Sequence, residues 1–173
     1  MLIGSARRDG HTALVARRLC SALGAAAVAI DLATRTIESF HYDRTDDRDD
    51  FRSIVRTMLA HPTIVLATPV YWYAMSGVMK QFFDRLTDLL MDADARPIGR
   101  ALAGRDLWVL ATGTDPALPP GFDEPFARTA GYFGMTWRGS AYVRFADGEL
   151  GAHADLSAVE RFADRLVSRG TVA

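Results

Sequence analysis

Short apolar runs recur along the chain and predict the strands of a sheet. The segments 27–32, 63–67 and 106–112 are mostly apolar, as expected of strands that are buried on both faces. Residues 136–143 form a further candidate strand. Only residues 1–3 precede the first glycine, which makes the first strand short beside the usual length of about five or six residues.

Between these strands, apolar residues recur every three to five positions, the spacing of helices with one buried face. The pattern predicts helices at 12–23, 50–60, 76–91, 124–133 and 156–168. Thr12 is the expected cap of the first helix, and Gly24, Pro62 and Gly134 mark helix ends. The apolar stripe over 76–91 is wider than one sheet face needs, so we expect part of it to contact a partner subunit.

Strands that alternate with helices at this pitch predict a parallel sheet covered on both faces. We therefore expect one α/β domain over residues 1–173, built as a flavodoxin-like, doubly wound, three-layer structure with five strands in the order 2-1-3-4-5. Ligands of such sheets bind at the carboxyl ends of the strands, here between the first and third strands. The loops 5–12, 68–76 and 112–121 should converge there.

The first of these loops has the composition of a phosphate site. It leads from a strand into a helix start and carries Ser5, Arg7 and Thr12, so that free amides, hydroxyls and a guanidinium would all favour an anion. It has neither the lysine of a Walker loop nor the glycines of a dinucleotide turn, which favours a mononucleotide. An ordinary polar turn is the alternative, and His11 either adds charge beside the phosphate or merely occupies the turn.

The other two loops have features suited to a flat ligand. Tyr71, Trp72 and Tyr73 are adjacent, and aromatics at the mouth of a sheet need a flavin ring, a neighbouring subunit or the core as a partner. In Thr112-Gly113-Thr114 the glycine lets backbone amides approach a ligand. Such amides can bind the pyrimidine side of a flavin, although a simple turn is equally consistent with this tripeptide.

Composition narrows the class of partner. The chain has 173 residues, 20 basic and 21 acidic, with a formal charge of -1, which argues against nucleic-acid or membrane-surface binding and favours a small molecule. The single cysteine, Cys20, excludes an internal disulfide and a cysteine cluster and fits a reducing, cytoplasmic setting. The first residues do not resemble a secretory signal, and Pro69 and Gly77 interrupt the longest uncharged stretch, so it is not expected to span a membrane.

Two further groups of residues favour structural roles. The acidic run at 43–50 lacks the glycine and glutamate of a calcium loop, so we interpret it as a solvated loop balanced by arginines. His41, His61 and His153 have no metal-ligand spacing. Asp31 stands where a dinucleotide fold has a ribose-binding acid, but without the glycines of that fold we interpret it as a polar residue at a strand end.

The motifs together resemble a known family. Ser5-x-Arg7-x-x-Gly10-x-Thr12, Pro69-Val70-Tyr71-Trp72, Ser76-Gly77, Lys80 and Asp84-Arg85 are similar to those of the NADPH-dependent FMN reductases, flavodoxin-like enzymes that include quinone and chromate reductases. The resemblance implies a noncovalent FMN whose phosphate is held by Ser5, Arg7, Gly10, His11 and Thr12. It implies that the ribityl chain and ring lie against Pro69, Val70, Tyr71, Trp72, Thr112, Gly113 and Thr114. It also implies a homodimer or homotetramer, in which the only lysine, Lys80, pairs with Asp84 or contacts a neighbouring subunit.

The expected activity is transfer of hydride from NADPH or NADH to bound FMN and of electrons on to a small acceptor such as a quinone. The flavin carries this chemistry, so no side-chain acid or base is required. One alternative is a flavodoxin-like electron carrier, against which the nearly neutral charge argues, since such carriers are usually acidic. Another is a non-catalytic binding module with a degenerate FMN site. A low-molecular-weight phosphatase is excluded, because its nucleophilic cysteine belongs in the first loop and Cys20 lies within the first helix.

Overall fold

The computed structural model describes residues 1–43, 48–146 and 156–170, and its centre is a parallel sheet. Five strands lie in the order β2-β1-β3-β5-β6, and a sixth, β4, pairs with β3 in the antiparallel direction. Their bounds are β1 (Leu2–Ile3), β2 (Ile30–Asp31), β3 (Thr63–Tyr71), β4 (Ala74–Met75), β5 (Asp106–Gly113) and β6 (Thr136–Arg144). With the hairpin strand β4 set aside, this is the predicted flavodoxin-like order 2-1-3-4-5, which is confirmed.

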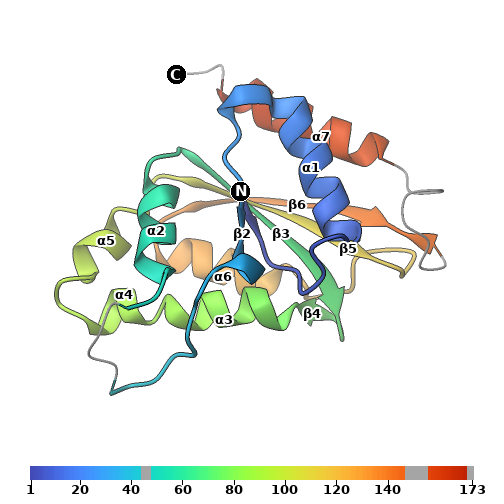
Figure 1. Ribbon diagram of the computed structural model, residues 1–173. Helices are drawn as coiled ribbons and strands as arrows, with labels where there is room; N and C mark the ends of the chain where they lie inside the picture. The colour runs from blue at the N-terminus through green and yellow to red at the C-terminus, as the bar shows by residue number, and fades with distance from the viewer. Residues whose placement is uncertain (44–47, 147–155, 171–173) are drawn as a thin grey trace.

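Helices cover both faces of the sheet (Figure 1). On one face lie α1 (His11–Leu23) and α7 (Ser157–Gly170). On the other lie α2 (Phe51–Leu59), α3 (Gly77–Arg85), α4 (Asp88–Met91), α5 (Arg96–Arg100) and α6 (Glu124–Tyr132). Two short 3-10 turns, η1 (Gly24–Ala26) and η2 (Leu32–Thr34), flank β2. The predicted three-layer arrangement is therefore present.

The core is divided by the sheet into two clusters. On β3, Ile64 and Leu66 belong to the cluster beneath α2, α3 and α6, whereas Val65 and Ala67 belong to the cluster beneath α1 and α7. Neighbouring residues of a strand point to opposite faces, so a strand buried on both sides must be apolar throughout. This is the physical reason why unbroken apolar runs predict β3 and β5.

Several predicted boundaries are wrong, each for a local reason. The helix expected over 76–91 is interrupted after Arg85, because the amides of Leu86 and Thr87 bond three residues back, which tightens the turn. The strand expected at 27–32 is only Ile30–Asp31, since it pairs with a β1 of the same length. The helix α5 was not predicted. In contrast, Gly24 ends α1 with a φ of 63°, as expected of a helix-terminating glycine.

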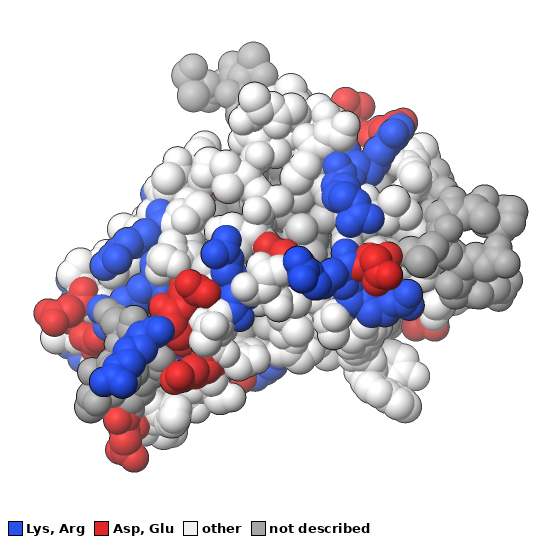
Figure 2. Space-filling view, in the orientation of Figure 1, with Lys and Arg blue, Asp and Glu red and all other residues white. Residues whose placement is uncertain are grey.

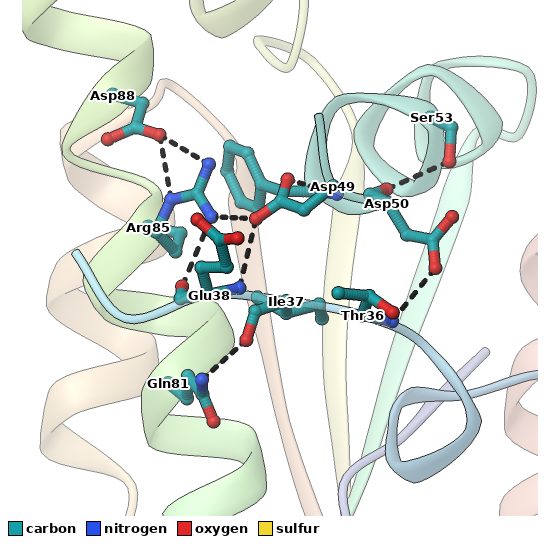
Figure 3. A network of polar contacts seen from close by, with 10 residues as sticks. Thr36, Ile37, Glu38, Asp49, Asp50, Ser53, Gln81, Arg85 and Asp88 are labelled. Atoms are coloured by element: carbon teal, nitrogen blue, oxygen red, sulfur yellow. Dashed lines mark hydrogen bonds and ion pairs between the residues drawn. The ribbon is translucent and has the colours of Figure 1, made fainter. Parts of the chain in front are cut away.

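A buried ion-pair network ties the polar segment before α2 to α3 (Figure 3). The side chain of Arg85 is 1 % exposed and contacts Asp49, whose side chain is 2 % exposed, and Asp88 at 2.7 Å. Arg85 also donates to the backbone carbonyl of Glu38 at 3.1 Å, and its guanidinium lies 4.8 Å from the ring centre of Phe51. The interpretation of 43–50 as a solvated loop is therefore wrong for Asp49, while 44–47 lie outside the described residues.

The pKa of Asp49 shows which influence dominates in this network. Burial alone would raise it, but hydrogen bonds from Arg85 and from the amides of Glu38 and Phe51 bring the pKa below its ordinary value. Asp49 is therefore ionised in the folded protein, as its position beside a buried guanidinium requires.

Charges on the surface are mixed in sign. Figure 2 shows basic and acidic side chains interspersed over the face in view, in keeping with the formal charge of -1. Within the described part of the chain, no helix is long and apolar enough to cross a membrane. Nor do those residues include a group of three His, Cys, Asp or Glu side chains placed to hold a metal ion.

Candidate flavin site

The three predicted loops meet in a cleft of about 290 Å³ at the carboxyl ends of β1, β3 and β5. It is lined by Ser5, Arg7, Gly10, His11, Thr12, Pro69, Val70, Tyr71, Thr112, Gly113 and Thr114. These are eleven of the twelve residues that the sequence singled out. The twelfth, Trp72, does not line the cleft.

The first loop brings unpaired donors to the start of α1. Gly10 precedes the helix in an extended conformation, and no side chain caps the helix start. The first intrahelical bond runs from the Leu14 amide to the Gly10 carbonyl, so the preceding amides of α1 have no partner within the helix. Ser5 closes the loop by donating to the Arg7 carbonyl at 3.2 Å and accepting from the Arg7 amide at 3.3 Å.

His11 adds a buried nitrogen to these donors. Its ring stacks on Phe145, with centroids 3.9 Å apart and an interplanar angle of 10°, which fixes the plane of the imidazole. Its Nε2 atom is buried and has no hydrogen-bond partner among the described residues. A buried polar atom without a partner costs about 1–3 kcal/mol, and a hydrogen-bonding group brought within reach of Nε2 would remove that cost.

Thr12 links two of the loops and does not cap the helix as predicted. Its hydroxyl lies 2.7 Å from that of Thr112, and both side chains are buried. The contact joins the start of α1 to the end of β5. Thr12 therefore fixes the spacing of the first and third loops through a contact that spans 100 residues and has no local sequence signal.

The second loop is a hairpin whose tip projects aromatic side chains. β3 continues through Tyr71, and a two-residue turn at Trp72 and Tyr73 leads into β4. Their φ angles are 50° and 67°, left-handed values that cost of order 1–3 kcal/mol per bulky residue. Trp72 is 92 % exposed and Tyr73 69 %, whereas Tyr71 is half-exposed and lines the cleft. The structure therefore separates Trp72 from the other predicted ring contacts.

Ser76 connects this hairpin to the first loop. Its hydroxyl donates to the Gly4 carbonyl at 2.6 Å and accepts from the Met79 amide at 3.1 Å, so it caps α3 while holding the end of β1. A Cβ at Gly4 would lie 2.7 Å from that of Met79, which explains the glycine. Ser76 and Gly4 thus set the position of the first loop without lining the cleft.

These residues fit FMN at its phosphate end. Unpaired helix amides and the exposed Arg7 guanidinium are donors, His11 Nε2 is a donor in the tautomer that protonates it, and a helix start favours an anion. Pro69, Val70 and Tyr71 line the same cleft and add largely apolar surface to it. The cleft volume is close to the lower end, about 300 Å³, of that usual for small-molecule pockets.

Comparison with known proteins identifies the family. The family model of the NADPH-dependent FMN reductases matches residues 1–117. The chain belongs to this family. The protein YwqN of Bacillus subtilis (strain 168), named as an NAD(P)H-dependent FMN-containing oxidoreductase, is 27 % identical over 94 % of each chain.

Solved structures agree with the fold. That of the Bacillus subtilis Trp repressor binding protein is 26 % identical, covers 92 % of this chain and 94 % of its own, and superposes with a TM-score of 0.71. The two-electron reduced flavodoxin of Megasphaera elsdenii has the same fold at 12 % identity, with coverage of 95 % and 97 % and a TM-score of 0.54.

Membership of the FMN reductase family confirms the resemblance seen in the sequence, and with it the oxidoreductase class and the FMN cofactor. The matched residues include the first loop, the aromatic hairpin and Thr112 to Thr114. Lys80 lies 2.5 Å from Asp84 one helical turn away, which is the first of the two roles considered for it. Strand β6, which borders β5, lies beyond the matched segment.

Proposed function

We infer that the cleft binds FMN and that the protein passes electrons from NADPH or NADH through this flavin to a small acceptor such as a quinone. The observation that carries this conclusion is the convergence of eleven predicted residues in one cleft with a buried, unpartnered His11 Nε2 at its phosphate end. Bound FMN supplies acceptance and donation of hydride and electrons. The chain supplies binding, orientation and exclusion of water.

At the phosphate end, several weak contributions act on one anion. The first amides of α1 and the helix dipole attract negative charge, and Arg7 adds a charge-assisted hydrogen bond. His11, held by Phe145, donates from Nε2 once an acceptor is present. Ser5 holds the backbone of this loop through its two bonds to Arg7, and Gly10 enters α1 in an extended conformation with no side-chain cap on the helix start.

At the ring end, the chain forms two walls. Tyr71 with Pro69 and Val70 offers an apolar surface for one part of the flavin, and Thr112 to Thr114 offer backbone groups for another. No carboxylate lines the cleft in the described structure, so proton exchange is left to solvent and substrate. The chain's contribution to rate is then the placement of nicotinamide and acceptor against the flavin.

The hairpin tip supports a role between subunits. Trp72 and Tyr73 lie in strained backbone conformations and are largely exposed, and both features are characteristic of functional surfaces. A homodimer or homotetramer in which this tip packs on a second copy explains why the strained backbone and the exposed aromatic side chains are retained.

Trp72→Asn, which suits a left-handed backbone, should lower the oligomeric state in light scattering without lowering the thermal midpoint. An unchanged assembly contradicts this role for Trp72.

The main test has two stages. The protein should quench FMN fluorescence on binding and, once loaded, oxidise NADPH or NADH continuously when a quinone is supplied. A protein with no FMN affinity contradicts the proposal at its first stage. Reduction of the bound flavin without turnover on any acceptor identifies an electron carrier instead, and a lack of reduction by either nicotinamide excludes the proposed donor.

A further inference from the structure

The third loop is held from outside the cleft by strand β6. The β5–β6 ladder ends at Gly113 and Arg144, and the amide of Phe145 donates to the Gly113 carbonyl at 2.8 Å. Arg144 Nε donates to the Thr114 carbonyl at 3.0 Å. Tyr142 Oη donates to the Asp115 carbonyl at 2.9 Å. Three successive carbonyls are thus directed toward one neighbouring strand.

The ring of Tyr142 also packs directly on Gly113. A Cβ at this glycine would lie 2.7 Å from Tyr142 Oη and 3.2 Å from Cε2, so only glycine allows the tyrosine to reach the loop. Burial and the nearby Asp115 carboxylate raise the pKa of Tyr142. The phenol therefore stays protonated and remains a donor at neutral pH.

This arrangement determines where the amides of the loop point. A trans peptide unit is planar, with its N–H opposite its C=O, and the described chain has no cis peptide. Because the Gly113 and Thr114 carbonyls face β6, the amides of Thr114 and Asp115 face the other way. In the sheet order, β3 and the cleft lie on that opposite side of β5. Neither amide donates a hydrogen bond to another described residue.

We propose that Arg144 and Tyr142 are positioning residues of the third loop and thereby raise the reduction potential of the bound flavin. Arg144 orients the Asp115 amide directly through the Thr114 carbonyl, beside the Thr114 amide that the Phe145 backbone orients. Tyr142 holds the next peptide unit, whose nitrogen belongs to Pro116 and carries no N–H, and so keeps these two amides in place toward the flavin. The proposal rests on FMN binding in the cleft. Reduction increases the negative charge on the pyrimidine side of a flavin, and oriented amides stabilise such charge because they need no reorganisation. Neither residue touches the flavin itself in this role, and both lie beyond the segment that the family model matches.

The test compares single substitutions in the FMN-loaded protein. Tyr142→Phe removes one hydrogen bond without changing charge. The loss of a hydrogen bond of ordinary strength weakens binding roughly threefold to tenfold. Here we expect the affinity for reduced FMN to fall by that factor relative to the affinity for oxidised FMN. For a two-electron couple, such a change in the ratio of affinities lowers the reduction potential by about 15–30 mV. The dissociation constant for oxidised FMN should rise by a smaller factor than this.

Substitutions of Arg144 distinguish the effect of its directed hydrogen bond from the effect of its positive charge. Arg144→Lys keeps the positive charge but not the directed Nε–H, so it should lower the potential about as much as Arg144→Gln does. If the arginine acts only through its charge, the lysine variant keeps the original potential. Tyr132→Phe and Arg128→Lys, which lie outside the cleft in α6, are matched controls and should leave the potential unchanged.

The possible outcomes distinguish the two proposals. If the unaltered protein does not bind FMN, the proposed function fails. If it binds FMN and the potential is unchanged in Tyr142→Phe and in both Arg144 variants, the positioning role alone is overturned. Thermal midpoints within the range of the control variants show that a lower potential does not arise from partial unfolding.

Discussion

The Arg85 network and the cleft are both polar clusters within the sheet-and-helix layers, and they differ in whether their donors are satisfied. Arg85 has carboxylates on two sides and a backbone carbonyl on a third. In the cleft, the first amides of α1 have no helical partner and His11 Nε2 has none among the described residues. A buried polar group is stable only when paired, so the first cluster holds the chain together whereas the second is incomplete without a ligand.

The largest expected effect comes from breaking the satisfied cluster. Arg85→Met leaves Asp49 buried without its cation, and losing one partner of a buried pair costs about 3–5 kcal/mol. The free energy of unfolding in urea measures this. Lys80→Met is the matched control, because the side chain of Lys80 is 58 % exposed and its ion pair is with Asp84 of the same helix. Such exposed pairs contribute about 0–1 kcal/mol. Equal losses in the two variants would contradict the distinction.

Substitutions in the cleft, whose donors are unpaired, should change ligand affinity and not the free energy of unfolding. Arg7→Ala removes a charge-assisted hydrogen bond, and because Arg7 is exposed we expect FMN binding to weaken by about tenfold, the low end for such bonds. Riboflavin, which lacks the phosphate, should bind as before. Arg8→Ala is the control, since Arg8 is also exposed but does not line the cleft. Equal loss for FMN and riboflavin would place Arg7 away from the phosphate.

A smaller change at His11 tests the orphaned nitrogen directly. His11→Phe keeps a ring to stack on Phe145 but has no donor, so FMN binding should weaken by roughly threefold to tenfold while stability holds or rises. His11→Asn restores a donor and should bind FMN more tightly than the phenylalanine variant. Titration by fluorescence quenching measures both. The role of Nε2 is wrong if His11→Phe binds FMN as well as the unaltered protein.

The smallest expected effect is a change in the slope of stability with pH, which reports the ionisation of Asp49. Its pKa is below the ordinary value in the folded protein, so the unfolded chain takes up its proton first as the solution is acidified. The stability that Asp49 contributes is therefore complete above its unfolded pKa, about 3.9, and is lost as the pH falls toward the folded value. Unfolding free energies measured from pH 6 to pH 3 should fall less steeply in Asp49→Asn. Asp84→Asn, at an exposed position, should follow the unaltered protein.

Much of the cleft is predictable because parallel strands end at one edge of a sheet. Once apolar runs locate β3 and β5, the polar and glycine residues that follow them must lie together, and Pro69 to Tyr71 and Thr112 to Thr114 do. Trp72 departs from this rule because β3 and β4 form a tight hairpin, whose two-residue turn points its side chains away from the sheet. A pattern of aromatics alone does not distinguish a cleft wall from such a tip.

The burial of Arg85 could have been inferred from its spacing along the helix, although not from composition. Arg85 lies three residues after Phe82 and six after Met79, both of which are buried, so its position on α3 is on the apolar face. A cation there requires buried carboxylates. Asp49 belongs to the acidic run that we interpreted as solvated. The pairing joins residues 36 apart, and no local pattern selects Asp49 from the neighbouring aspartates.

By itself, the sequence determined the alternation of strands and helices, the parallel sheet, the three convergent loops and the family, because these depend on local periodicity and on short motifs. Tertiary structure alone decided which polar groups are satisfied. Thr12 meets Thr112, Asp49 meets Arg85, and Tyr142 and Arg144 hold the third loop, while His11 Nε2 is left without a described partner. Hydrogen bonds depend on distances and angles of a few tenths of an ångström and a few tens of degrees, which are set by how distant segments pack.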